Sequence, residues 1–208
     1  CVPRVFEKIH AKFMQGVKSA PKIRQNLFNW ALNIGSKYSK LKVSKGKIGF
    51  FLSLKHKIAN KLIYSKVKAR FGGKIKFFVS GGAPLSKHLA EFFAAVDITI
   101  LEGYGLTETS PVLTVNSPTE LKFGYVGKPL FNVDIKIADD GEILAKGPNI
   151  MSQYYRNEEA TKEVFDKDGW FHTGDIGIID KDGFLKITDR KKSLIVTSGG
   201  KNIAPAPI

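Results

Sequence analysis

The residues best suited to chemistry form one run, Glu102-Gly103-Tyr104-Gly105-Leu106-Thr107-Glu108-Thr109. It follows the apolar run Ile98–Leu101, which predicts a short strand, and ligand sites in open α/β sheets lie at the carboxyl ends of strands. An aromatic ring can stack on a base, and a hydroxyl can reach a phosphate. A carboxylate can hold Mg²⁺, which prefers oxygen ligands and phosphate co-ligands. The run therefore fits a nucleotide site, although a plain strand-to-loop turn would look the same in isolation.

Three further segments carry chemistry and must be considered with this run. Gly81-Gly82-Ala83-Pro84 consists of small residues that let the backbone approach a ligand closely, although a tight turn is the more frequent meaning of such a segment. The second segment is Gly169–Asp175, and the third is Asp189–Lys192 followed by Gly199–Asn202. Acidic turn residues such as Asp139 and Asp180 are better explained by hairpin turns than by a metal site.

The first 73 residues predict a basic helical segment. Apolar residues recur with a helical period in three stretches, with Lys on the opposite faces. The expected faces are Val5, Ile9, Phe13 and Val17; Ile23, Leu27, Trp30, Ala31, Ile34 and Tyr38; and Leu54, Ile58, Leu62 and Val67.

Residues 74–118 predict a βαβ unit with parallel strands that carries the nucleotide site. Ile75–Val79 is the first expected strand, Ser86 caps a helix that runs to about Val96, and Ile98–Leu101 is the second strand. Residues 119–189 predict a small β-rich subdomain. It contains two hairpins, with turns at 139–141 and 180–183, and a short helix from Asn157. Residues 190–208 follow as a fourth segment. The fold class is α/β.

Charge is distributed very unevenly along the chain. Residues 1–76 hold 19 Lys and Arg against one acid, Glu7, whereas residues 77–208 hold 14 against 18 acids. A balance of +18 suits anionic lipid headgroups, nucleic acid or polyphosphate ligands. A set of solvated helix faces would give the same pattern.

Composition limits the class of protein. No apolar run approaches the roughly 20 residues of a membrane span, and the first residues lack the pattern of a signal peptide. Cys1 is the single cysteine of the chain, so neither an internal disulfide nor a Cys-rich metal site is expected. These features predict a cytoplasmic protein. Because the first residue is not Met, we expect the chain to be a piece of something longer.

The runs EGYGLTET, GWFHTGDIG and GFLKITDRKKSLIVTSGGKNIAP resemble those of the adenylate-forming enzymes, which include acyl-CoA synthetases, luciferases and adenylation domains. The three motifs occur in the family's order, and the resemblance covers essentially the whole chain. The start, Val2–Ile9, and the run Phe28–Leu32 resemble bacterial long-chain fatty-acid–CoA ligases more narrowly. The resemblance implies that the region is part of the large N-terminal domain of such an enzyme. It also implies ATP-dependent activation of a fatty acid to an acyl-adenylate, followed by thioester formation with coenzyme A.

The resemblance also implies roles for individual residues. The turn that lies along the adenine matches Gly82, Ala83 and Pro84, and the ring that stacks on the adenine matches Tyr104. Thr107 matches the hydroxyl near the α-phosphate, and Glu108 matches the carboxylate that holds Mg²⁺. Asp175 matches the acceptor of the ribose hydroxyls, and Arg190 matches a cation that reaches the ribose and phosphate. Glu102, Gly103 and Gly105 belong to the same nucleotide motif. Lys192 matches a hinge for a swinging C-terminal domain, and Gly200 and Lys201 a loop used in thioester formation. His172 is expected to orient the loop beside Asp175 rather than to act as an acid or base.

Two parts of the family pattern would lie outside the chain: a Ser/Thr/Gly-rich phosphate loop before Cys1, and a C-terminal domain with a catalytic lysine after Ile208. We therefore expect the 208 residues alone to be at most a weak nucleotide binder. Ser193 replaces the acid that many relatives carry after the hinge lysine. Two alternatives remain open: another adenylate-forming enzyme that uses an aryl or amino acid, and a basic lipid or nucleic-acid interaction module. The expected partners are fatty acid, coenzyme A and an anionic membrane surface at which the protein is peripheral, without a specific nucleic acid.

Overall fold

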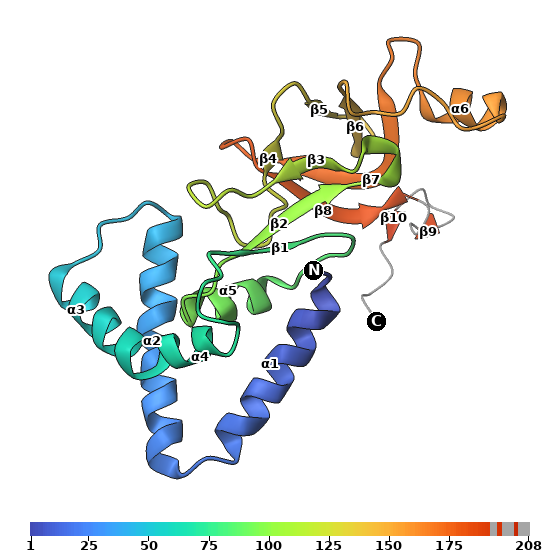
Figure 1. The fold of residues 1–208 in the computed structure, drawn as a ribbon. Helices are drawn as coiled ribbons and strands as arrows, with labels where there is room; N and C mark the ends of the chain where they lie inside the picture. Colours follow the sequence, from blue (N-terminus) through green and yellow to red (C-terminus); the bar gives the residue numbers. More distant parts are fainter. Residues whose placement is uncertain (192–194, 197–201, 204–208) are drawn as a thin grey trace. The chain divides into compact units, whose positions relative to one another are not determined.

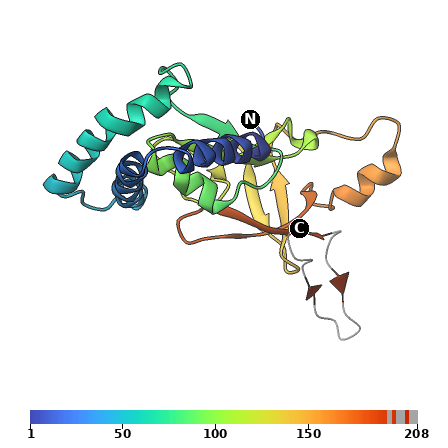
Figure 2. The same cartoon turned by 90° about the horizontal axis from the view of Figure 1, so that it is seen from below.

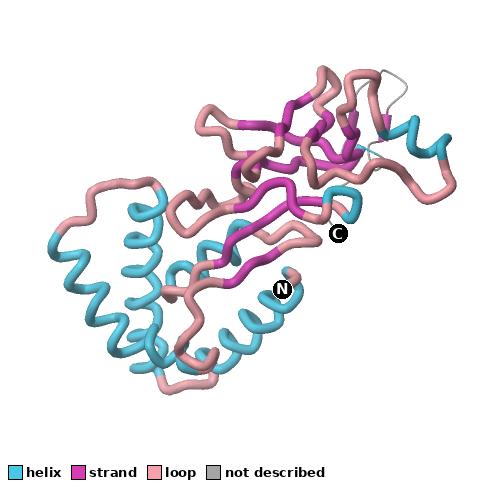
Figure 3. Tube along the Cα trace, turned by 45° about the horizontal axis from the view of Figure 1, so that its top comes forward, coloured by secondary structure: helices cyan, strands magenta, loops and turns pink. Residues whose placement is uncertain are grey.

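The computed structural model describes residues 1–191, 195–196 and 202–203. The chain divides into two compact units, Cys1–Glu102 with Asn116–Gly124, and Gly103–Val115 with the chain from Tyr125 onward. Most helices belong to the first unit and most strands to the second (Figure 3). No helix in the described part of the chain has the length and apolar character needed to cross a bilayer.

The elements of the first unit include helices α1 (Pro3–Lys18), α2 (Lys22–Val43), α3 (Phe50–Ala59), the π-helical turn η1 (Asn60–Tyr64), α4 (Ser65–Ala69), strand β1 (Phe78–Ser80) and α5 (Lys87–Ala95). Strand β2 (Ile100–Gly105) begins in the first unit and ends in the second. The second unit continues with the 3₁₀ turn η2 (Thr107–Thr109), β3 (Val112–Val115), β4 (Lys128–Pro129), β5 (Asp134–Ile137), β6 (Glu142–Lys146), α6 (Glu158–Val164), β7 (Phe171–Ile179), β8 (Leu185–Arg190), β9 (Ile195–Val196) and β10 (Asn202–Ile203).

Helices α1 and α2 diverge from the short loop that joins them and enclose the apolar core of the first unit with α5 (Figure 1). Phe6 of α1 lies at the centre of this core and makes edge-to-face contacts with Phe78 and Phe93. The predicted helices are confirmed. Ser86 also caps α5 as predicted, since its hydroxyl accepts a hydrogen bond of 3.3 Å from the Leu89 N–H.

The predicted buried face of α2 is partly wrong. The buried residues are Phe28, Ala31, Gly35 and Ser39, whereas Ile23 is exposed. Small residues line this face because α2 and α5 approach closely: a Cβ on Gly35 would lie 1.7 Å from the Ala95 carbonyl oxygen. Gly35 and Ser39 therefore belong to the buried face, but neither has an apolar side chain that a hydrophobic periodicity would reveal.

The predicted buried face of the third helix is wrong at three of four positions. Leu54, Ile58 and Leu62 are exposed, and only Val67 is buried. The segment attaches to α2 through its other side, where the Tyr64 hydroxyl donates a 2.6 Å hydrogen bond to the Ala31 carbonyl and the His56 ring stacks on Tyr38. Figure 2 shows α3 as a separate arm on the outer side of α2.

The parallel pairing predicted for residues 74–118 is confirmed, because β1 pairs with β2 in parallel, from Phe78 opposite Ile100 to Ser80 opposite Glu102. Two details differ from the expectation. Strand β1 begins at Phe78 rather than at Ile75, and its Val79 side chain is exposed. Strand β2 extends through Gly105, so the first four residues of the chemical run lie in the strand and not in the loop after it.

The second unit contains the antiparallel sheet β5-β6-β7-β8. Both predicted hairpins are confirmed, with β5 paired to β6 and β7 paired to β8. The core of this unit includes the side chains of Tyr104, Leu113, Val133, Ile143 and Leu185. Helix α6 starts after Asn157 as predicted, with the Asn157 side chain accepting a 3.0 Å hydrogen bond from the Ala160 N–H.

Candidate functional site

Three of the predicted site residues meet in the second unit. The Tyr104 hydroxyl donates a 2.7 Å hydrogen bond to Asp175 Oδ2, and Arg190 Nε lies 3.4 Å from Asp175 Oδ1. The register of β7 and β8 causes the second contact, because Asp175 and Arg190 are direct cross-strand partners. Tyr104 and Asp175 are buried, whereas the Arg190 side chain is exposed. A carboxylate oxygen has two lone pairs, so Asp175 can still accept hydrogen bonds from a ligand.

Burial is the main cause of a strongly raised pKa for Tyr104, which an interaction with the Thr173 side chain opposes and the Asp175 charge reinforces. The phenol therefore stays protonated and acts as a fixed donor to Asp175. The Thr173 hydroxyl in turn donates to the Ile143 carbonyl at 2.8 Å and accepts from the Asp175 N–H at 3.2 Å. These contacts fix the position of the carboxylate without occupying all of its acceptor sites.

Glu108 lies in the η2 turn and is held at both its backbone and its side chain. The Met151 N–H donates to the Glu108 carbonyl at 2.7 Å, and the Tyr154 hydroxyl donates to Glu108 Oε1 at 2.9 Å. Sequence reasoning missed Tyr154, which lies 46 residues further along the chain with no local pattern to connect it. Thr107, beside Glu108, is exposed at the surface of the unit.

The turn after β2 has its own support. The Thr109 hydroxyl donates to the Pro111 carbonyl at 2.6 Å, and the Asn149 amide donates to the carbonyls of Thr109 and Val112. At Gly105 a Cβ would lie 1.7 Å from the Pro111 carbonyl oxygen, so this close approach requires glycine. Gly105 therefore has a packing role that is independent of any ligand.

A second polar cluster centres on Glu142, which sequence reasoning did not identify as important. Its carboxylate accepts hydrogen bonds from the Gly174 N–H and Lys191 Nζ, and it contacts His172 Nδ1 at 2.9 Å. Burial opposes ionisation of Glu142, but these donors outweigh it and lower its pKa. The second partner of Lys191 is Asp140 at 2.7 Å. His172 thus contacts Glu142 next to Gly174 and Asp175, a position that fits the expected orienting role.

The remaining predicted residues fall elsewhere. Gly82, Ala83, Pro84 and Glu102 belong to the first unit, and Gly82 has a φ of +80°. Gly103 lies in β2 and pairs with Val115. Lys192, Gly200 and Lys201 lie outside the described residues.

Glu102 has an unusual environment. Its side chain is buried, and Oε1 has no hydrogen-bond partner among the described residues. Burial raises the pKa of Glu102 to about 7, against a smaller lowering by a hydrogen bond from the Gly124 backbone.

No group of three or more His, Cys, Asp or Glu side chains that could hold a metal ion occurs within residues 1–191. Glu108 offers one carboxylate. That donor set fits Mg²⁺, which is commonly held by one or two carboxylates together with substrate phosphates and water.

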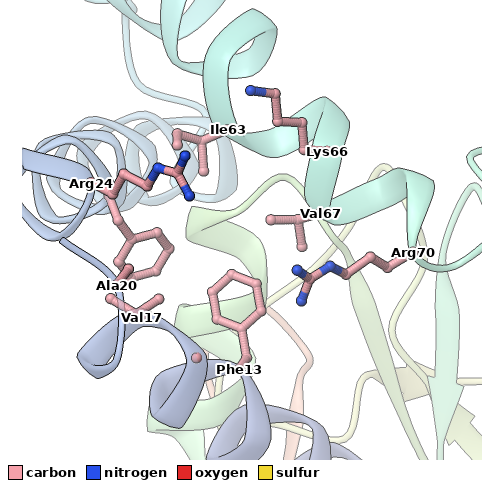
Figure 4. A pocket seen from close by; sticks show the side chains of 10 residues that line it. Phe13, Val17, Ala20, Arg24, Ile63, Lys66, Val67 and Arg70 are labelled. Carbon is pink, nitrogen blue, oxygen red and sulfur yellow. The ribbon is translucent and has the colours of Figure 1, made fainter.

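An apolar hollow of about 280 Å³ lies in the first unit between α1, α2 and the η1–α4 segment (Figure 4). Its apolar lining includes Phe13, Val17 and Val67, and the guanidinium group of Arg70 points into it toward Phe13. None of the predicted site residues is among the residues that line it.

Comparison with known proteins places this geometry in context. Residues 1–155 match the family described as AMP-binding enzyme. The chain is 47% identical over 205 residues to the long-chain-fatty-acid–CoA ligase FadD15 of Mycobacterium bovis, covering 99% of this chain and 34% of that protein. It is 36% identical over 222 residues to the peroxisomal long chain acyl-CoA synthetase 6 of Arabidopsis thaliana, covering 100% of this chain and 30% of that protein. The chain thus spans about a third of the length of these relatives.

Two solved structures show the same fold over part of the chain. ATP-bound MatB from Rhodopseudomonas palustris has a TM-score of 0.60 and 38% identity, covering 66% of this chain and 29% of that one. O-succinylbenzoate coenzyme A synthetase from Bacillus subtilis, in complex with ATP and magnesium ion, has a TM-score of 0.56 and 36% identity, covering 68% of this chain and 33% of that one.

Proposed function

Because this chain belongs to the family of AMP-binding enzymes, we propose that the protein containing it is an AMP-forming long-chain fatty-acid–CoA ligase. In the first step, a fatty-acid carboxylate oxygen attacks the α-phosphorus of ATP, and pyrophosphate leaves with the electron pair of the broken P–O bond. In the second step, the sulfur of coenzyme A attacks the acyl carbon, AMP leaves, and the thiol proton is released. The relatives named as long-chain ligases, which align over nearly the whole chain, support this choice.

The observation that carries the proposal is the Asp175 carboxylate, held between Tyr104 and Arg190. We propose that Asp175 accepts the two ribose hydroxyls, because an ionised carboxylate offers only acceptors to a diol. Arg190 supplies a planar fork of donors toward ribose and phosphate. Tyr104 presents its ring to the adenine.

Phosphate and backbone contacts complete the proposed site. Thr107 would donate to the α-phosphate, and Glu108 would hold Mg²⁺, which neutralises phosphate charge when bound. Gly82, Ala83 and Pro84 would line the adenine, with Glu102, Gly103 and Gly105 in the same motif. Lys192 is proposed as the hinge, with Gly200 and Lys201 in the loop used for thioester formation. Because the chain spans a third of its relatives, we propose that the 208 residues alone bind nucleotide weakly at most.

The test is the substitution Asp175→Asn in the full-length protein. Loss of a charged acceptor for two hydroxyls should raise the KM for ATP by roughly 10- to 100-fold, because a hydrogen bond to a charged group is worth about 1.5–3 kcal/mol. Pyrophosphate release with ATP, palmitate and Mg²⁺ provides the measurement.

The matched control is Asp182→Asn, which changes an acid in the turn of the same hairpin. It should leave the KM for ATP within about twofold. An Asp175→Asn enzyme that folds normally and keeps the parental KM would remove the ribose contact from the proposal.

A second candidate is another adenylate-forming enzyme. Its support is that MatB and O-succinylbenzoate coenzyme A synthetase are the solved structures named above, rather than fatty-acid ligases. A panel of palmitate, aryl acids and amino acids separates the two candidates by which acid drives pyrophosphate release.

We also propose a cytoplasmic, peripheral location in which the basic segment 1–76 meets an anionic membrane surface, with fatty acid and coenzyme A as substrates and no specific nucleic acid. The charge balance of that segment supports this part of the proposal. We further propose four segments along the chain, 1–73, 74–118, 119–189 and 190–208.

A further inference from the structure

Helix α3 and the turn after it present a row of apolar side chains to solvent. The row, called here the α3 stripe, consists of Phe50 and Phe51, each 76% exposed, Leu54 at 46%, Ile58 at 45% and Leu62 at 39%. Positions 50, 54, 58 and 62 are four residues apart and position 51 is three before 54, so all five lie on one side of the helix. Single exposed apolar residues are ordinary on protein surfaces, but a contiguous row marks an interaction surface.

The opposite side of the segment attaches it firmly to α2. Ala59 and Tyr64 are fully buried, Tyr64 donates to the Ala31 carbonyl, and His56 stacks on Tyr38 with ring centroids 3.8 Å apart. Figure 1 and Figure 2 both show α3 on the outer side of α2, with no other helix of the first unit beyond it. The α3 stripe is therefore exposed on an ordered element rather than on a frayed end.

Cations border the stripe on both sides. Helical spacing places Lys55 along one border and Lys57 and Lys61 along the other. None of these three ammonium groups has an ion-pair or hydrogen-bond partner within residues 1–191. No acid occurs in the sequence between Glu7 and Glu91, so no carboxylate on the same helix offsets their charge.

We propose that the α3 stripe is a membrane-docking surface that inserts Phe50, Phe51 and their neighbours into the interface of an anionic lipid bilayer. An apolar face bordered by lysines lies in the plane of such an interface, with the rings among the acyl chains and the ammonium groups at the phosphates. A second copy of the same surface is disfavoured because it would bring two lysine-bordered faces together. The inference names the surface behind the membrane part of the proposed function and does not depend on the ligase chemistry.

The first test measures binding of the full-length protein to sonicated vesicles by co-sedimentation. One set of vesicles contains phosphatidylcholine alone, and the other contains 30% phosphatidylglycerol. The variant carries Phe51→Ser, Leu54→Ser and Ile58→Ser together, and should lose at least 10-fold in partitioning to the anionic vesicles. All three side chains are exposed, so the variant should keep the parental melting temperature within a few degrees.

The matched control is Ile23→Ser on α2, whose side chain is 82% exposed but stands apart from the α3 stripe. It should bind vesicles as the parent does. Activity on a water-soluble short-chain acid in the absence of vesicles should be unchanged in both variants. This readout separates failure of the docking surface from failure of the proposed ligase reaction.

The second test reports position. Tryptophan introduced as Phe51→Trp should be quenched by vesicles of brominated lipid after subtraction of the parent's emission, whereas Ile23→Trp should not. The inference would be overturned by no binding to anionic vesicles, by equal binding of the triple variant, or by equal quenching at both positions. Loss in the triple variant of a concentration-dependent dimer of the parent would also overturn it, by assigning the stripe to a second copy. Slow hydrogen exchange at Phe51 and Leu54 of the parent in the absence of vesicles, lost in the triple variant, would overturn the inference as well. That result would show that another part of the same protein covers the α3 stripe.

Discussion

Glu102 is a carboxyl group that the fold removes from water, with 5% of the residue exposed and one oxygen lacking a partner among the described residues. Its pKa is raised to about 7 by burial, from 4.5 in an exposed position. At pH values between these two pKa values, the Glu102 carboxyl keeps its proton in the native state and has released it in the unfolded chain. Stability therefore falls as pH rises through this window and becomes level above it.

We predict that Glu102→Gln removes this part of the pH dependence. Over the window from pH 4.5 to 7 the parent should lose about 3 kcal/mol relative to the variant, since each pKa unit is worth about 1.4 kcal/mol. Urea unfolding of both proteins at several pH values measures the difference. Glu159→Gln on the exposed side of α6 is the control and should run parallel to the parent. If the stability of Glu102→Gln changed with pH in parallel with that of the parent, the raised pKa of Glu102 would be contradicted.

At the same scale, the sequence motifs identified Tyr104, Asp175 and Arg190, and the structure brings these three together. The motifs could not show that Tyr104 donates to Asp175, because 71 residues separate them and they lie in strands of two different sheets, β2 and β7. Tyr154 and Glu142 were missed for the same reason, since their partners are distant in sequence and neither lies in a recognisable pattern.

At the scale of elements, the contact between α2 and α5 depends on the absence of a side chain at Gly35. We predict that Gly35→Ala destabilises the protein by about 3 kcal/mol, because the new methyl group would overlap the Ala95 carbonyl and force the helices apart. Thermal unfolding of the full-length protein measures this change.

Gly16→Ala is the matched control, since Gly16 lies within α1 and a Cβ there would meet no atom within 4 Å. It should be neutral or stabilising by up to about 1 kcal/mol, because alanine loses less backbone entropy in a helix. Equal effects of the two substitutions would show that the helices can separate at little cost.

Helix and strand positions were largely predictable, whereas helix faces were not. Periodicity locates α1, α2 and α3, but Gly35 and Ser39 carry no apolar signal although both are buried. The third helix failed for the opposite reason: Leu54 and Ile58 carry a strong apolar signal and yet face solvent. A hydrophobic periodicity shows that a helix has an apolar face, but only the packing of the folded chain determines whether that face contacts the core.

At the scale of the whole molecule, stability should be unevenly distributed within the second unit. Helix α6 has no buried residue, whereas Ile143 and Ala145 of β6 are fully buried between paired strands. We predict that the α6 amides exchange hydrogen at least 100-fold faster, after correction for intrinsic rates, than those of β6. Mass spectrometry of peptides covering 158–164 and 142–146 measures the ratio, and similar protection of the two would contradict the prediction.

The π turn Asn60–Tyr64 has a consequence for changes of chain length. Such a turn corresponds to one residue inserted into an α-helix. Deleting one residue there would leave an unbroken helix in which Val67 keeps its buried position, because the wide turn already absorbs the extra residue. Substitution of Lys61 or Leu62 leaves that register unchanged. Between α3 and α4, natural variation should therefore accept the loss of one residue within this turn, whereas a single deletion in the regular helix on either side would rotate Val67 by about 100° away from its buried position.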